Sequence, residues 1–160
     1  MSKKVKTNAL RKLDQQKIPY EIFTYSVDGD QVDGITVANK IGQPIDEVYK
    51  TLVLHGKNGH YVAVIPVEAT LNIKAISKVV GEKKLEMLAV KDLEKTTGYI
   101  RGGCSPVGMK KQFPTVLDES VQHHETIIVS AGQIGLQMKV KVSDLLHLIN
   151  AKVSGIADVD

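Results

Sequence analysis

Apolar positions along this chain recur with two different periods, which predicts short helices and short strands mixed together. Helical spacing or helix-ending residues predict five helices, over about residues 4–16, 36–41, 72–80, 90–96 and 143–149. Alternating or short apolar runs predict strands at 20–25, 50–54, 61–66, 85–88, 115–117, 126–129, 136–140 and, at a sheet edge, 153–156. The elements lack the regular alternation of a doubly wound sheet, so the pattern favours an α+β fold with a mixed sheet.

Turn-forming residues separate these elements. Lys17-Ile18-Pro19 ends the first helix, and Gly42 and Gly81 follow the second and third. Gly56-Lys57-Asn58-Gly59 lies between two apolar runs and predicts a hairpin. The polar stretch 26–34 is predicted to be a loop.

Length and composition are those of a single globular domain, which we expect to span residues 1–160. The chain is 42% hydrophobic and 24% charged, and it contains no internal repeat or long linker. Its single cysteine excludes an internal disulfide and fits a reducing compartment. No apolar run approaches the length of a membrane span, and the basic N-terminus leads into a polar amphipathic stretch. We therefore expect a cytoplasmic protein that does not bind a membrane.

Charge adds little by itself. The formal net charge of +3 is too small to predict nucleic-acid binding. Lysines gather at 74, 78, 83 and 84 and again at 110–111. A solvated lysine face is the favoured interpretation, although Lys110 and Lys111 could meet a phosphate backbone if the preceding loop holds a ligand.

The segment Thr97–Gly108 concentrates glycines, a proline and the only cysteine in twelve positions. Glycine persists where the backbone turns tightly or approaches a ligand, and Pro106 stiffens the loop. Such a loop can offer backbone N–H groups to an anion or oxyanion. A tight structural connection uses the same residues, so the segment alone leaves both interpretations open.

Two further segments carry the same ambiguity. Lys50 precedes the apolar run 51–54, where a lysine is either a solvent-facing end of the strand or an ammonium at the mouth of a pocket. Ser130-Ala131-Gly132 ends an apolar strand, either as a simple turn or as a hydroxyl beside closely approaching backbone.

Cysteine and histidine chemistry is weakly supported. Cys104 could be a nucleophile, but no local pattern ties a histidine to it, and lone cysteines are commonly small buried hydrophobes. The adjacent His123 and His124 would point to opposite sides of an extended strand, and no second ligand pair has useful spacing. We expect neither a metal site nor a cofactor.

Four segments together resemble the YbaK/EbsC family of aminoacyl-tRNA deacylases, which is related to the editing domain inserted in bacterial prolyl-tRNA synthetases. They are the strand at Tyr25, Tyr49-Lys50-Thr51-Leu52, the segment 97–111, and Val129–Gly132 with Gly135-Leu136. Gly102-x-x-x-Pro106 matches the family's Gly-x-x-x-Pro signature. In order and spacing these segments cover nearly the whole chain.

The resemblance implies a single domain with a mixed, partly barrel-like β-sheet surrounded by helices. It implies hydrolysis, in trans, of mischarged Cys-tRNA(Pro), and also of Cys-tRNA(Cys). A pocket made for proline rejects an amino acid of similar size by only about 1–3 kcal/mol, so a second hydrolytic site restores fidelity. The implied partner is the 3′ end of aminoacyl-tRNA. The modest net charge suggests little recognition of the tRNA body, so we expect tRNA(Pro) to be selected through a ternary complex with prolyl-tRNA synthetase.

The resemblance also implies roles for particular residues. Lys50 matches the essential lysine, expected to bind the terminal adenosine phosphate or to stabilise charge near the ester. Gly102 and Gly103 are expected beside the aminoacyl carbonyl, with their N–H groups facing the oxyanion. The residues that the resemblance places in substrate binding are Tyr25, Thr51, Pro106, Ser130 and Gly132, with Thr51 the weaker match.

No acid–base pair stands out among these positions, which agrees with a substrate-assisted mechanism in which the cysteinyl thiol attacks its own ester carbonyl. Three alternatives stay open. One is an Ala-tRNA(Pro) deacylase that uses a water nucleophile. Another is a non-catalytic module that binds tRNA ends or the synthetase. The last is a hydrolase that uses the Cys104 thiol.

Overall fold

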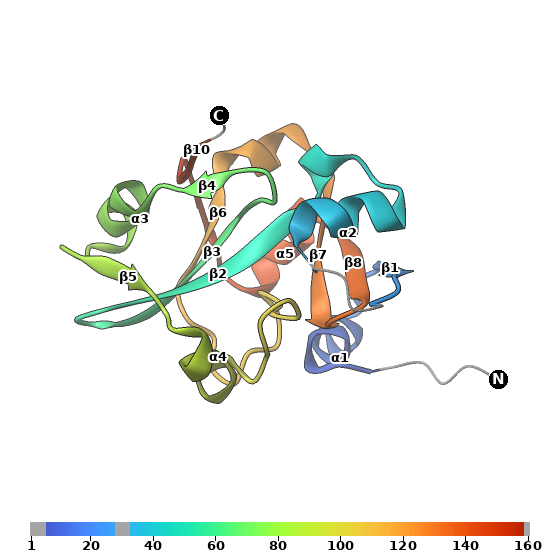
Figure 1. Cartoon of the computed structure of the whole chain (residues 1–160), viewed down its shortest axis with the longest axis horizontal. Helices are drawn as coiled ribbons and strands as arrows, with labels where there is room; N and C mark the ends of the chain where they lie inside the picture. Colours follow the sequence, from blue (N-terminus) through green and yellow to red (C-terminus); the bar gives the residue numbers. More distant parts are fainter. Residues whose placement is uncertain (1–5, 28–32, 159–160) are drawn as a thin grey trace.

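The strands of this protein form three separate sheets, as the computed structural model of residues 6–27 and 33–158 shows (Figure 1). The α-helices are α1 (Asn8–Gln15), α2 (Gly34–Ile41), α3 (Ile73–Val80), α4 (Val90–Thr97) and α5 (Val142–Leu148), with 3-10 turns η1 (Ile45–Glu47) and η2 (Glu119–His123). The strands are β1 (Glu21–Thr24), β2 (Tyr49–Gly56), β3 (Gly59–Pro66), β4 (Thr70–Leu71), β5 (Leu85–Met87), β6 (Thr115–Asp118), β7 (Thr126–Gln133), β8 (Leu136–Lys141), β9 (Lys152–Ser154) and β10 (Ala157–Asp158).

Side-chain caps start several helices at the positions that the sequence predicts or one to two residues away. The Asn72 side chain accepts a hydrogen bond from the Ala75 N–H at the start of α3, as predicted. Asp33 caps α2 in the same way, so α2 begins two residues earlier than predicted. Gly42 and Gly81 end α2 and α3 in the left-handed conformation, which confirms their role as helix ends.

The largest differences from the predicted elements lie at strand ends. β2 and β3 each extend to the turn at Lys57-Asn58, because hairpin pairing continues from Tyr49↔Pro66 to Gly56↔Gly59 whatever the polarity of the outer residues. The two-residue strands β4 and β10 were missed, since neither is an apolar run. Residues 4–5 of the predicted first helix and residues 28–32 of the predicted loop lie outside the described residues. Residues 6–7 are not helical, and α1 begins only at Asn8, after the Thr7 cap.

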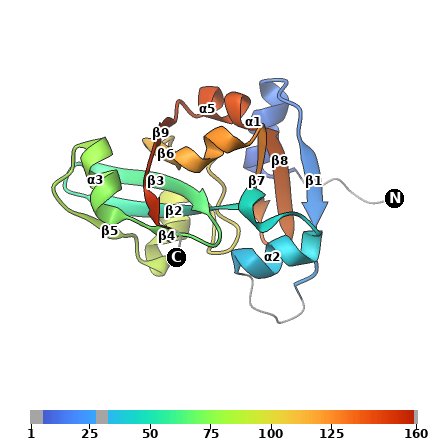
Figure 2. The same ribbon diagram turned by 90° about the horizontal axis from the view of Figure 1, so that it is seen from above.

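The larger sheet has the order β5-β2-β3-β6-β9 and is mixed. β2 pairs antiparallel with β5 and β3, whereas β3–β6 and β6–β9 are parallel. The position of β9 at one edge confirms the predicted edge strand. The smaller sheet, β1-β8-β7, is antiparallel and has α1 and α2 on opposite sides in both views (Figures 1 and 2).

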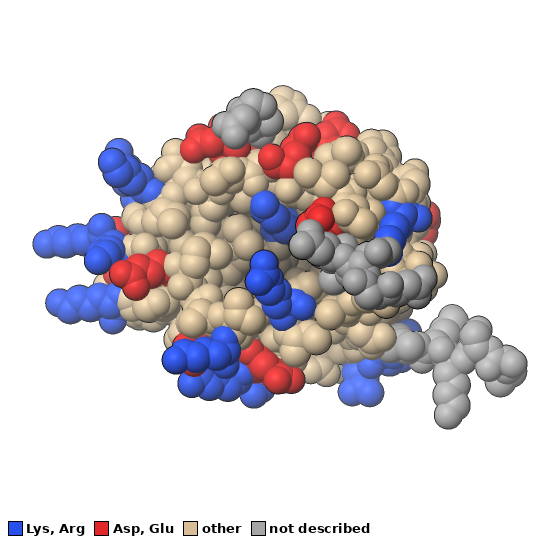
Figure 3. All heavy atoms as spheres, viewed as in Figure 1, with Lys and Arg blue, Asp and Glu red and all other residues tan. Residues whose placement is uncertain are grey.

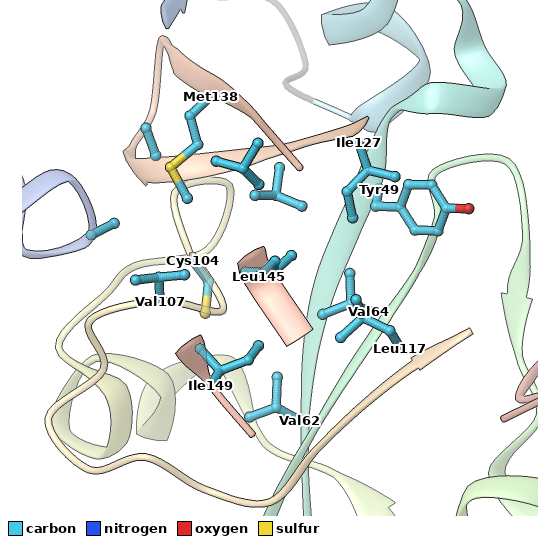
Figure 4. Close-up of a cluster of buried hydrophobic side chains, with 14 of the residues drawn as sticks. Tyr49, Val62, Val64, Cys104, Val107, Leu117, Ile127, Met138, Leu145 and Ile149 are labelled. Carbon is cyan, nitrogen blue, oxygen red and sulfur yellow. The ribbon is translucent and has the colours of Figure 1, made fainter. Parts of the chain in front are cut away.

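The two sheets meet but do not close into a barrel. Their backbone connection is a parallel bridge between Val48, just before β2, and Ile128 in β7. The main apolar cluster fills the space beside this junction, with Val64 and Leu117 from one sheet, Ile127 and Met138 from the other, and α5 packed in through Leu145 (Figure 4). The mixed α+β fold is therefore confirmed. The bridge at the sheet junction also fixes the backbone where β2 begins.

Candidate active site

A cavity of about 1030 Å³ opens where the two sheets meet. Its walls come from β2 and the residue before it, the start of α2, the glycine-rich loop and the smaller sheet. The lining residues are Val48, Tyr49, Lys50, Thr51 and Leu52; Asp33, Gly34, Ile35, Thr36 and Val37; Arg101, Gly102 and Cys104; Ser130 and Gln137; and Val67. Figure 3 shows this face hollowed near its centre, with Lys or Arg side chains above and below the hollow.

Lys50 lies in the cavity wall two residues after the sheet junction. Its backbone is fixed by hairpin pairing opposite Ile65, and its side chain is partly buried. Within the described ranges it forms no ion pair or hydrogen bond, and burial lowers its pKa below the ordinary 10.5. An ammonium in a cavity wall that is not engaged in an ion pair is suited to bind an anionic group there.

Two buried hydroxyls in the described part of the chain have no hydrogen-bond partner: Thr51 Oγ1 and Tyr25 Oη. Buried polar groups are normally satisfied, so such an orphan points to a missing partner. Thr51 is among the lining residues next to Lys50, but its hydroxyl oxygen is itself buried. Tyr25 is outside the cavity lining; its backbone N–H donates to the Gly135 carbonyl at the β7–β8 turn.

The glycine-rich loop turns back at the cavity. The Gly103 N–H donates to the Ile100 carbonyl at 3.0 Å, closing a tight turn, and Gly102 has the positive φ of 87° that such a turn requires. The Gly103 N–H is therefore occupied. Among the described residues, the N–H groups of Gly102 and Cys104 have no protein partner, and both residues line the cavity.

A network of hydrogen bonds holds this loop in place. The Tyr99 hydroxyl donates to the Val107 carbonyl, and the Tyr99 N–H donates to Thr97 Oγ1. The Cys104 thiol points into the main apolar cluster near Val107 and Ile149 (Figure 4), and burial raises its pKa to about 12. The thiol is protonated at neutral pH, which argues against the Cys104 hydrolase alternative.

Ser130 and Gln137 face each other across β7 and β8 and contribute the smaller sheet's part of the lining. Ser130 Oγ accepts a hydrogen bond from the Gly132 N–H, at the irregularity where β7 and β8 shift register. Gln137 is 6% exposed, and its side-chain amide has no hydrogen-bond partner in the described structure. Gln137 can therefore offer both a donor and an acceptor to a ligand.

The cavity brings together half of the residues that the sequence points to. Its lining includes Lys50, Thr51, Gly102 and Ser130. The others are not among its lining residues: Gly103 packs against the β7–β8 turn, Pro106 is buried, Gly132 lies in the β7 irregularity, and Tyr25 follows β1.

Sequence reasoning missed Asp33, Arg101 and Gln137. Asp33 carries an N-cap signal, and the hydrogen bonds from the Thr36 N–H and then the Thr36 hydroxyl lower its pKa, so it is a carboxylate at neutral pH. Arg101 is an exposed cation at the turn, next to the glycines. The sequence holds no signal for Gln137, because only the pairing of β7 with β8 brings it beside Ser130.

The model of the aminoacyl-tRNA editing domain family matches residues 32–148, which include the whole cavity lining. The chain belongs to this family. The editing-domain chain is 47% identical over 152 residues to EbsC of Enterococcus faecalis, a protein assigned as a Cys-tRNA(Pro)/Cys-tRNA(Cys) deacylase. That match covers 94% of this chain and 93% of EbsC, which confirms the resemblance to the YbaK/EbsC family.

More distant matches include a segment of a larger enzyme and two solved structures with the same fold. A proline–tRNA ligase of Fervidobacterium nodosum is 26% identical over 71% of this editing-domain chain, but only 21% of the ligase is covered. A solved structure described as a trans-editing enzyme for prolyl-tRNA synthetase superposes with a TM-score of 0.83 at 20% identity, covering 97% of this chain and 99% of that one. The hypothetical protein APE2540 superposes with a TM-score of 0.86 at 18% identity, over 95% and 100%.

The arrangement of residues in the editing-domain cavity suits charge stabilisation better than acid–base relay. No histidine occurs among the lining residues. In residues 6–27 and 33–158, no group of three histidine, cysteine, aspartate or glutamate side chains is placed to hold a metal ion. No helix in the same ranges is long and apolar enough to cross a bilayer. In place of a histidine or a metal-binding group, the cavity offers two cations, Lys50 and Arg101, together with unpartnered N–H groups, the Asp33 carboxylate and uncommitted polar side chains.

Proposed function

We propose that this protein is a cytoplasmic, trans-acting deacylase that removes cysteine from Cys-tRNA(Pro), and also from Cys-tRNA(Cys). The observation that carries the proposal is the Lys50 ammonium, which shares the cavity with unpartnered loop N–H groups and forms no ion pair in the described structure. Membership of the editing family and 47% identity to a relative assigned to this reaction support the choice of substrate.

The cavity is suited to hold the aminoacylated 3′ end of the tRNA. Its volume of about 1030 Å³ is at the upper end of the roughly 300–1,000 Å³ of small-ligand sites. The amide of Gln137 can pair with the ribose, base or amino group of this ligand. The N–H groups of Gly102 and Cys104, with Lys50, then stabilise negative charge on the ester oxygen during the reaction.

The nucleophile comes from the substrate. The cysteinyl sulfur attacks the carbonyl carbon of its own ester, an S–C bond forms, and the C–O bond to the ribose breaks. The ribose oxygen leaves with the proton that the thiol has lost, and the cyclic thioester then reacts with water. The protein supplies orientation and oxyanion stabilisation, and the protonated thiol of Cys104 takes no part.

Replacing Lys50 tests the role of the cation. We expect Lys50→Ala to lower kcat/KM for Cys-tRNA(Pro) by about 100-fold or more, the effect of removing one oxyanion-stabilising group. The measurement is release of labelled cysteine over time, with Lys141→Ala, an exposed lysine outside the cavity, as the control. Near-normal turnover by Lys50→Ala would overturn this role.

Which amino acids the enzyme releases from tRNA(Pro) identifies the nucleophile. Alanine has no thiol, so a substrate-assisted enzyme releases cysteine but not alanine from tRNA(Pro), whereas a water-dependent one releases both. A non-catalytic module binds charged tRNA without accelerating its decay. A panel of mischarged tRNAs assayed with the wild-type protein separates these outcomes.

We also propose that prolyl-tRNA synthetase selects the tRNA for this enzyme in a ternary complex. The small net charge of +3 supports this, because strong electrostatic recognition of a whole tRNA needs a larger excess of positive charge. Adding the synthetase to the deacylation assay is expected to narrow the range of tRNAs that are used.

A further inference from the structure

A second hollow lies at the other end of β2, away from the candidate active site. It has a volume of about 650 Å³, and its lining includes Lys57, Lys83 and Lys84. These three exposed lysines are called the tip patch below. Figure 3 shows Lys and Arg side chains gathered and projecting at the left edge of the molecule, where Figure 1 places β5 and the β2–β3 turn.

The tip patch is assembled from two segments that are held together by a buried acid. Lys57 belongs to the β2–β3 turn, and Lys83 and Lys84 belong to the α3–β5 connection. Glu82, which is 7% exposed, joins these segments by accepting hydrogen bonds from the Asn58 N–H at 2.9 Å and the Tyr61 hydroxyl at 2.7 Å. Glu82 also lines the hollow, but its carboxylate is committed to these two donors, while the neighbouring lysines are exposed.

The charges of the tip patch are only partly compensated. Lys84 lies 3.4 Å from a carboxylate oxygen of Glu86, an exposed pair that contributes little. Lys57 and Lys83 form no ion pair within the described ranges. Lysines that only keep a surface hydrated can be scattered over it. Here lysines from two separate segments line one hollow, and this placement favours a polyanionic partner.

We propose that the tip patch binds phosphates of the tRNA acceptor stem while the 3′ end occupies the cavity. This inference rests on the proposed function. The length of β2, which joins the cavity to the tip patch, supports it. Lys50 and Gly56 are six residues apart on β2, which spans about 20 Å at about 3.3 Å per residue. At the per-strand spacing of about 3.4 Å in a duplex, 20 Å corresponds to about six nucleotides. An RNA strand that runs from the cavity along β2 would thus bring its first base pairs to the tip patch.

The proposed contact fixes the position of the RNA and does not read its sequence. Lysine binds phosphate as a point charge, and phosphate contacts carry no base information. The tip patch thus agrees with selection of the tRNA through the synthetase: it adds affinity for any acceptor stem and leaves identity to the partner.

Neutralising the tip patch tests the proposal. The variant is Lys57→Gln/Lys83→Gln/Lys84→Gln, and the matched control is Lys12→Gln/Lys141→Gln/Lys152→Gln, which removes the same charge from exposed positions outside both hollows. Each protein is assayed with full-length Cys-tRNA(Pro) and with cysteine esterified to a CCA trinucleotide, at several salt concentrations. Affinity for uncharged tRNA is measured in parallel.

We expect the tip variant to lose about tenfold in kcat/KM on full-length tRNA at low salt and to keep wild-type kcat/KM on the trinucleotide. The salt dependence should flatten by about 0.7–0.9 in log–log slope for each phosphate that the variant no longer binds. Affinity for uncharged tRNA should fall in step, a readout that stands even if the wild type proves inactive and the proposed function fails.

Three results would overturn the proposal: equal losses in the control variant, equal losses on the trinucleotide, or unchanged tRNA affinity. A defect that appears only when prolyl-tRNA synthetase is added would also overturn it, because the tip patch would then bind the synthetase and not the RNA.

Discussion

The buried ammonium of Lys50, which we assign to the reaction, lowers the stability of the folded protein. Burial lowers its pKa below 10.5 because the cavity wall disfavours the charged form. The unfolded chain therefore binds this proton more tightly than the folded one, which lowers the free energy of unfolding. This cost is fully present below the folded pKa, shrinks as the pH rises towards 10.5, and is absent above it.

Replacing the ammonium by an apolar group of similar length should therefore stabilise the protein. We expect Lys50→Met to unfold at a higher denaturant concentration than the wild type at pH 7. The difference should narrow as the pH rises from the lowered pKa of Lys50 towards 10.5. Urea titrations at several pH values measure this, with Lys141→Met as the control for charge removal at an exposed position. A difference that does not change with pH would contradict the assignment.

Also at the residue scale, sequence could identify Lys50 and Thr51 but not Gln137. The first two lie in a short segment with a family pattern, and each then proves to be an unpartnered polar group at the cavity. Gln137 becomes a cavity residue only through its register opposite Ser130. Whether a polar side chain is buried without a hydrogen-bond partner depends on contacts between distant segments, so it cannot be predicted from composition.

At the scale of elements, the glycine-rich loop divides its work between neighbouring residues. Gly102 provides the positive φ of the turn and lines the cavity. Gly103 allows close packing instead: a Cβ there would lie 2.9 Å from the Ile134 nitrogen and 3.1 Å from the Gln133 carbonyl carbon. Both contacts are with backbone, which cannot rotate out of the way.

Gly103→Ala should displace the loop and reduce both stability and activity. Overpacking of this kind costs about 1–3 kcal/mol of unfolding free energy. A shift of about 1 Å in a positioning group can cost about 100-fold in rate, so kcat/KM should fall at least tenfold. Gly42→Ala is the matched control: Gly42 has a positive φ of 68°, but a Cβ added there would have no atom within 4 Å.

The two glycine variants are compared by denaturant titration and by deacylation. Gly42→Ala should lose about 1–2 kcal/mol because an L-residue is forced into the left-handed conformation, and it should keep wild-type kcat/KM. If Gly103→Ala retained full activity, the loop position would not matter for catalysis.

Local sequence signals explain which helices and strands could be predicted. Capped helices such as α3 and the β2–β3 hairpin follow from local signals, namely Asn72, Gly81 and the turn at Lys57-Asn58. The glycines predict a tight turn at Gly102. They do not predict that the Gly103 N–H donates to the Ile100 carbonyl and is therefore unavailable to a ligand. Which N–H groups stay free depends on how the loop closes, and glycine content does not determine that.

At the scale of the whole molecule, the C-terminal segment ties the layers around the larger sheet together. β9 pairs with β6, and β10 pairs with β4 next to α3. Ile156 between them is fully buried, and its carbonyl accepts a hydrogen bond from the Asn72 N–H at 2.7 Å. A mixed sheet could be predicted from the order of elements, but this closure depends on two-residue strands that leave no apolar pattern.

Asp118 is the centre of this closure. It lies at the end of β6 and is 6% exposed. One carboxylate oxygen accepts from the N–H groups of Ile156 and Ala157 at 3.0 and 3.1 Å, and the other accepts from the Ser120 N–H at 3.1 Å. Hydrogen bonds to a charged acceptor are worth about 1.5–3 kcal/mol, and removing this acceptor leaves buried donors unsatisfied.

We expect Asp118→Ala to lower the free energy of unfolding by about 2–4 kcal/mol, measured by urea titration, and Asp118→Asn to lose less because its amide oxygen can still accept. Asp46→Ala, at an exposed position, should change stability by less than about 0.5 kcal/mol. Asp118 does not line the cavity, so kcat/KM of each folded variant should equal that of the wild type. A loss of activity without a loss of stability would mean that the C-terminal closure positions the site, through Ser120, whose hydroxyl is hydrogen-bonded to the cavity-lining Tyr49.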